Sequence, residues 1–261
     1  MKIVVCIKQV PDTAEVRIDP DTNTLVRDGI DVMVNPFDEY AIEEAIRLRE
    51  AHGGTTVALS MGPPQAVEAI RQAMAMGMDE GVLLSDRAFA GADTLATGYA
   101  LSRAVQKMGD VDLVICGKQA IDGDTAQVGP GVAEVMGLPF VAYVRKIDEV
   151  AGDHLVLERL MDDGIEKLRM PLPGLITVVK EINEPRIPSL RGMMRAKKAE
   201  IPTWTAADLE EGTERFGLTG SPTQVVKTFT PEAREGGEKL EGEPAEQAKV
   251  LLDKLREAKV L

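Results

Sequence analysis

The sequence predicts an α/β fold: a doubly wound, mainly parallel sheet with helices on both faces, a small antiparallel β extension and a long C-terminal arm. Two observations favour this fold. Short, β-branched apolar runs alternate with amphipathic segments over the first two-thirds of the chain, a rhythm typical of parallel strands joined by right-handed helical crossovers. Near residue 140 the pattern changes to short strands separated by turn residues, and after Lys180 it becomes irregular.

The first strand is expected at Ile3–Ile7, because this run is almost wholly apolar and rich in β-branched residues. A hairpin is expected over Glu15–Asp28. A helix then begins at Asn35-Pro36, with asparagine as the cap and proline at the first helical position, and ends at Gly53-Gly54. The same alternation predicts strands and helices in turn at Thr56–Ser60, Gln65–Met76, Gly81–Leu84, Asp93–Met108, Asp112–Cys116 and Thr125–Met136.

Three antiparallel strands are expected within about residues 140–171, before Ile176–Val179 returns to the parallel sheet. Residues 180–198 are rich in basic side chains, which suits either a solvated face or a docking surface. Residues 213–244 hold little core, and 244–260 read as a final helix. We therefore expect a nucleotide-binding domain over 1–182, a distinct segment at 183–200 and an arm over 201–261 that lies on something else.

Composition excludes several function classes. The chain has 261 residues and a net charge of −13, which argues against nucleic acid and anionic membrane surfaces as partners. No apolar run is long enough for a membrane span. Two cysteines cannot form a disulfide framework, so a cytoplasmic setting is expected. The two histidines stand far apart without ligand spacing, so no metal site is expected.

Loops that leave the carboxyl ends of the predicted strands are the natural place for a ligand in an open parallel sheet. Several of them begin helices, and a helix N-terminus preceded by glycine can hold an anion. We expect Gly123 and Gly129 to let the backbone approach a ligand, and Asp124 or Thr125 to cap the helix that follows. Asn35 and Asp93 are either caps only or part of the site.

Standard nucleotide motifs are absent: the sequence has no Walker A pattern and no Gly-x-Gly-x-x-Gly after its first strand. No nucleophile or acid–base pair stands out either, and Cys6 and Cys116 read as small core residues. The residues alone therefore predict a nucleotide cleft without a catalytic side chain, and an arm that needs a partner.

Five stretches, in the same order, resemble the beta (small) subunit of the electron-transfer flavoproteins. They are Val4–Asp12 (VVCIKQVPD), Asn35–Ala41 (NPFDEYA), Gly117–Asp124 (GKQAIDGD), Asn183–Arg186 (NEPR) and Met194–Lys198 (MRAKK). The resemblance implies a heterodimer with a larger alpha subunit that carries a flavin, and an adenine nucleotide in the cleft of this chain. The arm over 201–261 would wrap the alpha subunit.

Matching positions imply a set of contacts to the nucleotide and another to a partner. The nucleotide contacts are Cys6, Asn35, Pro36, Phe37, Asp38, Met61, Gly62, Gly117, Lys118, Gln119, Ala120, Asp122, Gly123, Asp124, Thr125, Ala126, Gln127 and Val128. Residues 183–200 match the family's recognition loop. The docking residues implied there are Leu190, Arg191, Met194, Arg195, Lys197 and Lys198.

Three stretches resemble the bifurcating branch of this family, which holds FAD in the beta site, rather than the ordinary branch, which holds AMP. They are Gly91–Thr97, Asp122–Pro130 and Gly220–Lys227, and the first adds Gly91, Ala92, Asp93, Thr94 and Thr97 to the expected contacts. In that branch NADH delivers a hydride to the beta flavin. One electron then reaches ferredoxin or flavodoxin, and the other passes through the alpha flavin to an acyl-CoA dehydrogenase or quinone reductase.

The sequence thus predicts an FAD-binding subunit of a bifurcating flavoprotein, and it is uncertain whether the chain counts as an enzyme by itself. An AMP-binding structural subunit is the alternative within the same family. An alternative of another class is a free-standing adenine-nucleotide sensor, which shares the alternating α/β layout.

Overall fold

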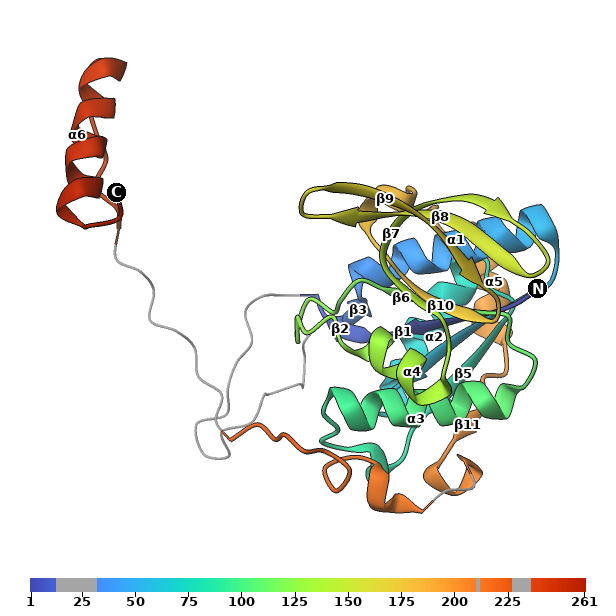
Figure 1. The fold of residues 1–261 in the computed structure, drawn as a ribbon. Helices are drawn as coiled ribbons and strands as arrows, with labels where there is room; N and C mark the ends of the chain where they lie inside the picture. The colour runs from blue at the N-terminus through green and yellow to red at the C-terminus, as the bar shows by residue number, and fades with distance from the viewer. Residues whose placement is uncertain (13–31, 210–211, 227–235) are drawn as a thin grey trace. The chain divides into compact units, whose positions relative to one another are not determined.

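The computed structural model of the chain describes residues 1–12, 32–209, 212–226 and 236–261 (Figure 1). The hairpin expected over Glu15–Asp28 lies outside the described residues. The chain divides into two compact units, Met1–Val226 and Lys227–Leu261. The expected division at 1–182, 183–200 and 201–261 stays a prediction.

A nine-stranded sheet in the order β11-β5-β4-β1-β6-β10-β7-β8-β9 forms the centre of the first unit (Figure 1). Neighbouring strands are parallel from β11 to β7, and β8 and β9 continue the sheet in antiparallel pairs. The predicted fold class is confirmed. The strand bounds are β1 Lys2–Ile7, β4 Thr55–Met61, β5 Glu80–Leu84, β6 Leu113–Gly117, β7 Phe140–Val150, β8 His154–Met161, β9 Gly164–Pro171, β10 Gly174–Val178 and β11 Thr203–Trp204; β2 Gln9–Pro11 and β3 Val32–Val34 pair separately.

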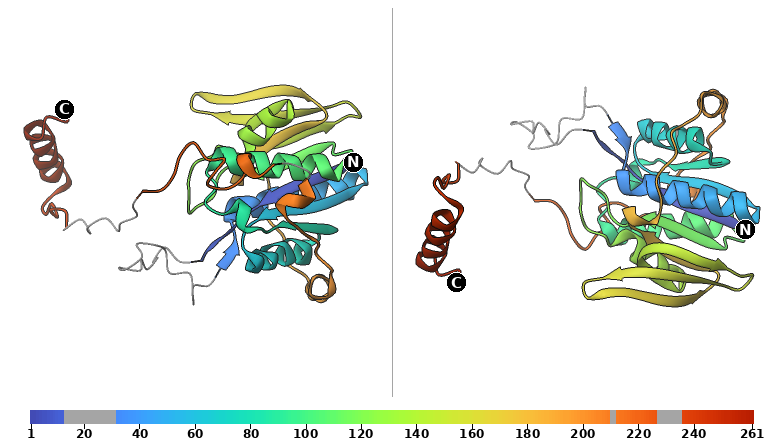
Figure 2. Two further views of the ribbon diagram at one scale, coloured as in Figure 1. Left: turned by 90° about the horizontal axis from the view of Figure 1, so that it is seen from below. Right: turned by 90° about the horizontal axis from the view of Figure 1, so that it is seen from above.

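Helices cover both faces of the sheet, as Figure 2 shows from two sides. One hydrophobic cluster joins Ile3, Val5 and Ile7 to helices α1, α2 and α5, and the other joins Val4 and Cys6 to helices α3 and α4. Side chains of β1 thus alternate between two cores, as a strand buried on both faces requires. The bounds are α1 Pro36–His52, α2 Val67–Met76, α3 Thr94–Met108, α4 Val128–Met136, α5 Leu190–Lys198 and α6 Pro244–Glu257, with short 3₁₀ turns η1 Pro64–Ala66, η2 Arg87–Phe89, η3 Lys180–Ile182, η4 Ala206–Leu209 and η5 Thr213–Arg215.

Helix α5 corrects the expectation that regularity fails after Lys180. The Ser189 side chain caps the helix by accepting a hydrogen bond from the Gly192 N–H. Gly192 lets α5 approach α2 closely, because a Cβ at this position would run into the carbonyl oxygen of Ala75. The sequence pattern missed this helix because it is short and its glycine is a poor helix former.

The beginning of the expected arm packs on the first unit's own sheet. Strand β11 pairs with β5 in parallel, and Leu209 is buried. Phe216 is only 1% exposed, and its ring meets the edge of Phe89 with centroids 5.2 Å apart. The described residues within 213–244 hold little core, as expected, with Phe216 as the exception. In the second unit the expected final helix is present as α6, which exposes Val250 and Leu251, and its wrapping of an alpha subunit stays a prediction.

Candidate functional site

The strand order reverses between β1 and β6. From β1 the chain builds the sheet toward β4 and β5, and it then returns to place β6 on the other side of β1. The carboxyl ends of β1 and β6 therefore border the crevice in which open α/β sheets bind ligands. The loop that begins at Lys8 follows β1, and the loop that begins at Lys118 follows β6. The structure therefore places two of the predicted loops side by side.

Asn35 stands at the N-cap position of α1, but its side chain connects this helix start to the loop after β6. Its side chain makes no capping hydrogen bond to α1. Instead Nδ2 donates to the Gln119 carbonyl at 2.8 Å, and Oδ1 accepts from the Ile121 N–H at 3.1 Å. Asn35 is 1% exposed, so these bonds are shielded from water. The start of α1 is thereby fixed to the loop that follows β6.

Asp38 and Gly117 lie beneath this connection between α1 and the loop, and we call this part of the site the floor of the cleft. The Asp38 carboxylate accepts a 2.7 Å hydrogen bond from the Lys8 N–H and is 6% exposed. Burial raises the pKa of Asp38 to about 7, although hydrogen bonds from Lys8, Asn35 and Gly117 act in the opposite direction. A Cβ at Gly117 would lie 2.6 Å from the carbonyl carbon of Phe37. Glycine is therefore required where β6 passes the first turn of α1.

The loop between β6 and α4 carries backbone strain that no sequence pattern indicates. Asp124 and Ala126 adopt positive φ values of 51° and 54°, a region that side chains other than glycine rarely occupy. The Gln119 amide donates to the Asp124 carboxylate, and the Asp124 N–H donates to the Ala120 carbonyl. These bonds hold the strained turn together. Backbone strain of this kind clusters at ligand sites.

Helix α4 begins at Val128, so the expected cap at Asp124 or Thr125 is wrong. Its N-cap residue is Gln127, whose side chain makes no capping hydrogen bond. Of the described residues, none accepts a hydrogen bond from the N–H groups of Thr125, Ala126 or Gln127. This helix end can therefore donate to an anionic group of a ligand.

Glycine is needed at position 129 for a different reason from the one expected. A Cβ at this position would lie 2.6 Å from Thr177 Cγ2, so the glycine lets α4 pack against β10 rather than against a ligand. Gly123 is exposed and does not use a positive φ. The two glycines of the loop are thus not its strained positions.

Asp93 caps helix α3 and also connects it to the segment around Thr223. Its Oδ1 accepts from the N–H groups of Leu95 and Ala96 at 3.0 Å each, and its Oδ2 accepts from the Thr223 N–H and hydroxyl at 3.1 and 2.8 Å. Its own N–H donates to the Ser221 hydroxyl at 2.8 Å. Burial acts to raise the pKa of Asp93, but these hydrogen bonds outweigh it and leave the pKa lowered. The carboxylate occupies the N-terminus of α3, so this helix end is not open to a second anion.

Three separate stretches therefore meet at one rim. The Thr94 hydroxyl donates to Gln127 Oε1 at 3.0 Å, which connects the start of α3 to the loop before α4. Asp93 adds the segment at Ser221–Thr223, some 130 residues along the chain. Met61 and Gly62 lie at the same edge of the sheet, at the end of β4, where the Gly62 N–H donates to the Leu84 carbonyl.

Tyr143 is a candidate site residue that the sequence did not indicate. It has a φ of 60°, and its N–H donates to the Thr177 hydroxyl at 3.2 Å next to a register shift between β7 and β10. The Lys118 ammonium lies 5.5 Å from the centre of its ring. The only sequence signal is an aromatic residue inside a strand, which the core alone would explain.

Helix α5 presents an exposed apolar surface beside basic residues. Leu190 is 72% exposed and Met194 58%, and the residue Ile187 before the helix is 91% exposed. The charged side chains of Arg191, Lys197 and Lys198 are also exposed. Such a surface suits a partner that combines an apolar contact with acidic groups. We call Ile187, Leu190, Arg191, Met193, Met194, Lys197 and Lys198 the α5 surface.

Arg195 holds α5 on its own domain. Its guanidinium donates to the carbonyls of Met74 and Met78 at 3.0 and 2.8 Å, at the end of α2. Arg71 of α2 returns the contact by donating to the carbonyls of Ala196 and Ala199 at 2.6 and 3.3 Å. Each arginine thus caps the C-terminus of the other helix. These contacts position α5, and the direct docking that the resemblance implies for Arg195 stays a prediction.

The start of the segment 183–200 is fixed to α1 by a third arginine. Arg186 donates to Glu43 Oε2 at 2.8 Å and to Glu50 Oε1 at 2.7 Å, and the Glu43 side chain is 6% exposed. Asn183 donates to the Tyr40 carbonyl at 3.0 Å. Both ends of the segment 183–200 are therefore anchored, and the α5 surface is left outward.

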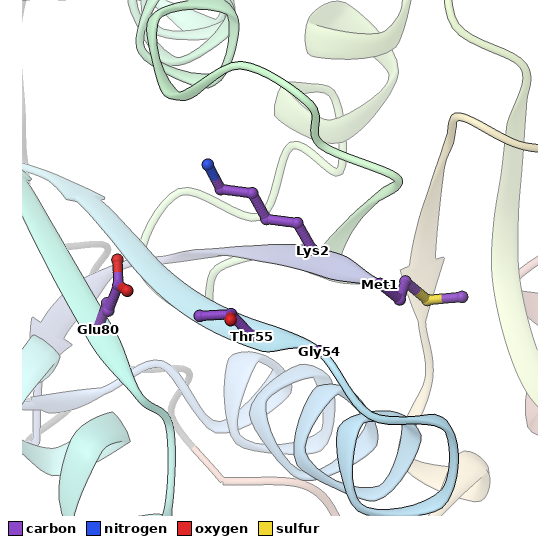
Figure 3. A pocket seen from close by; sticks show the side chains of 5 residues that line it. All are labelled: Met1, Lys2, Gly54, Thr55 and Glu80. Carbon is purple, nitrogen blue, oxygen red and sulfur yellow. The ribbon is translucent and has the colours of Figure 1, made fainter.

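A shallow pocket lies at the opposite edge of the sheet, at the amino ends of β1, β4 and β5 (Figure 3). It is lined by Met1, Lys2, Gly54, Thr55 and Glu80. The Lys2 ammonium donates to the carbonyl of Met108 at 2.6 Å, where it caps α3. Among the described residues, no helix is long and apolar enough to cross a membrane, and no acidic, histidine and cysteine side chains cluster as metal ligands.

Comparisons with known proteins agree on one family. The model of the electron transfer flavoprotein domain matches residues 22–209. An electron transfer flavoprotein subunit beta of Thermoanaerobacterium thermosaccharolyticum is 52% identical over 262 residues, 100% of each chain. The caffeyl-CoA reductase-Etf complex subunit CarD of Acetobacterium woodii is 46% identical over 263 residues, again 100% of each chain. The protein FixA of Azorhizobium caulinodans is 48% identical over 241 residues, 90% of this chain and 86% of the relative.

Proposed function

Because the chain belongs to the electron transfer flavoprotein family, as a beta subunit with an alpha subunit as its partner, we propose that its cleft binds FAD and that the heterodimer bifurcates electrons from NADH in the cytoplasm. The family match over most of the chain removes the case for a free-standing nucleotide sensor. One relative is named as a subunit of a caffeyl-CoA reductase-Etf complex, which is consistent with a redox partnership.

The observation that favours FAD rather than AMP as the ligand is the rim at which three stretches of the chain meet. Two of the three stretches that resemble the FAD-binding branch, around Asp93 and around Ser221–Thr223, are hydrogen bonded to each other. Thr94 then connects them to Gln127 in the third stretch, the loop before α4. AMP is shorter than FAD and would need fewer of these contacts. A rim that extends to α3 and to the segment 220–226 supports a longer ligand.

The chain's own residues would bind and orient the cofactor. The open N-terminus of α4, with the N–H groups of Thr125 to Gln127, suits a pyrophosphate. Asn35 and Gly117 fix the loop that carries these donors. Tyr143 and Lys118 stand beside it at the same edge of the sheet. When bound, FAD supplies the redox chemistry, and the protein sets its position and electrostatic environment.

We also propose that the α5 surface docks redox partners. An acyl-CoA dehydrogenase or quinone reductase would meet Leu190 and Met194, with acidic groups opposite Arg191, Lys197 and Lys198. Ferredoxin or flavodoxin is the proposed low-potential acceptor. A ring of opposite charges around an apolar contact steers association and sets register more than it adds affinity.

An anaerobic NADH titration of the heterodimer tests the redox part of this proposal. We expect NADH alone to bleach the visible flavin absorbance, because a flavin in the beta site would accept its electrons. Flavin absorbance that NADH leaves unchanged, while a partner dehydrogenase reduces it, would assign the chain to a structural and docking role with AMP. The control is the same titration with a variant in which Leu190→Ala removes only the docking contact.

A further inference from the structure

The two cysteines of the chain lie side by side at the floor of the cleft. Cys6 in β1 and Cys116 in β6 are direct partners in the parallel register of the two central strands. Both belong to the hydrophobic cluster on the α3 and α4 side, so both side chains point to the same face of the sheet. They are 7% and 6% exposed. Each stands one residue before the end of its strand, next to the loops that begin at Lys8 and Lys118.

The geometry of this pair meets the requirement for a disulfide. Neighbouring strands are about 4.8 Å apart, and disulfides join residues whose Cα atoms are about 4.4–6.8 Å apart. Because the two residues are register partners and lie on the same face of the sheet, their side chains are neighbours. Both are free thiols here. We propose that Cys6 and Cys116 form an oxidisable dithiol, a redox-sensitive site beneath the nucleotide loops.

A small peroxide is the oxidant class that suits a site with so little exposure. Hydrogen peroxide transfers one oxygen to the first sulfur, which gives a sulfenic acid and releases water. The second thiol then attacks that sulfur, forms the S–S bond and releases a second water. In total two thiols lose two electrons and two protons, and one peroxide is reduced to two waters.

The surroundings of the pair make this reaction slow. The hydrogen bond with Cys6 and burial both raise the pKa of the Cys116 thiol, and the nearby Asp38 carboxylate acts in the same direction. A protonated thiol is a poor nucleophile. The position of the pair under the proposed cofactor also implies that bound nucleotide shields it, and this part rests on the proposed function.

The test is peptide mapping of the heterodimer after peroxide treatment, followed by alkylation of the remaining thiols and digestion with trypsin. Cleavage after lysine places Cys6 in Ile3–Lys8 and Cys116 in Met108–Lys118. We expect these two peptides to appear as one disulfide-linked species that dithiothreitol separates. Cys116→Ala and Cys6→Ala serve as matched controls, and each should abolish the linked species.

Recovery of both peptides with alkylated thiols, or oxidised separately to sulfinic acids, would overturn the inference. A second arm compares the nucleotide-free heterodimer with the same complex supplied with FAD. We expect FAD to slow formation of the linked peptide at least several-fold. Equal rates in the two samples would contradict the proposed position of the cofactor over Cys6 and leave the dithiol itself established.

Discussion

Around the cleft, the loops are joined by backbone groups and by side chains buried in the fold, whereas α5 is held by guanidinium groups that are only partly buried. Asn35, 1% exposed, connects two loops through its amide. Arg195 and Arg71 connect two helices through carbonyls at their C-termini. Buried hydrogen bonds fix a geometry closely because a lost partner leaves an unsatisfied group. Charged contacts that are only partly buried hold less tightly and are screened in part by salt.

This difference implies that the two regions can be damaged separately. The cleft opens at the carboxyl ends of the strands, while α5 contacts the end of α2, just before β5 begins. A change in one region should therefore leave the other's function intact. The predictions below run from the largest expected effect to the smallest.

Replacing Gly117 by alanine should have the largest effect. Its Cβ would run into the Asp38 side chain and the Phe37 backbone, and a backbone cannot move aside as a flexible side chain can. Overpacking of this kind costs about 1–3 kcal/mol, so we expect nucleotide affinity to fall by about tenfold to a hundredfold. The measurement is equilibrium binding of the nucleotide to the apo heterodimer.

Gly131→Ala is the matched control for this change. It lies in α4, and a Cβ there meets no described atom within 4 Å. Affinity should stay within about twofold of wild type, while the helix gains about 0.5–1 kcal/mol of stability. If Gly117→Ala bound nucleotide as Gly131→Ala does, the floor of the cleft would be assigned incorrectly.

Gly192→Ala should damage docking and spare the nucleotide. Alanine is the better helix former by about 1 kcal/mol, but its Cβ would meet the Ala75 carbonyl and push α5 from α2. We expect the KM for a partner protein to rise about tenfold, equivalent to about 1.4 kcal/mol, with kcat nearly unchanged. A variant that is more stable than wild type with the same KM would show that the position of α5 does not set docking.

Asp38 should give the cleft a pH dependence that α5 lacks. Its pKa of about 7 in the folded chain lies above the usual value of an aspartate, so the folded state binds the proton more tightly than the unfolded state. Stability from this group is therefore complete below about pH 4 and is lost as the pH rises toward 7. Denaturant unfolding at several pH values should show this fall, and Asp38→Asn should flatten it. A wild-type curve parallel to that of the variant would exclude Asp38 as the source.

Ser189→Ala should produce the smallest effect. At the start of α5 the Ser189 hydroxyl accepts a capping hydrogen bond from the Gly192 N–H, and loss of an N-cap costs about 1 kcal/mol. We expect a rise of a few-fold in the partner KM and no change in nucleotide content. Since α5 is anchored by charged groups, the rise should be larger at high salt; an effect on nucleotide content would contradict the separation of the two regions.

The architecture could be predicted from the sequence because periodicity reports burial directly. Runs such as Ile3–Ile7 are apolar on both faces, and the structure places them between two helical layers. Helix α1 begins where Asn35-Pro36 predicted it. Helix α5 and the buried Phe216 were missed, because a single buried ring or a short helix depends on contacts with distant segments that no local pattern encodes.

The structure brings the expected site loops together at one crevice, but the contacts among them could not be predicted from the sequence. The loops at Asn35 and Gly117 stand at the crevice that sheet topology dictates. That Asn35 connects loops instead of capping a helix, and that Asp124 and Ala126 carry the strain, depends on tertiary hydrogen bonds. Tyr143 owes its position to a shift in strand register, which has no sequence signature.

The content of FAD and AMP in the heterodimer, measured after acid extraction of the complex purified with its alpha subunit, tests the account most directly. The extended rim from Asn35 to Thr223 predicts two FAD and no AMP per heterodimer. One FAD and one AMP would contradict it, and would reduce the contacts around Asp93 and Thr223 to a structural connection between α3 and the chain that follows Phe216.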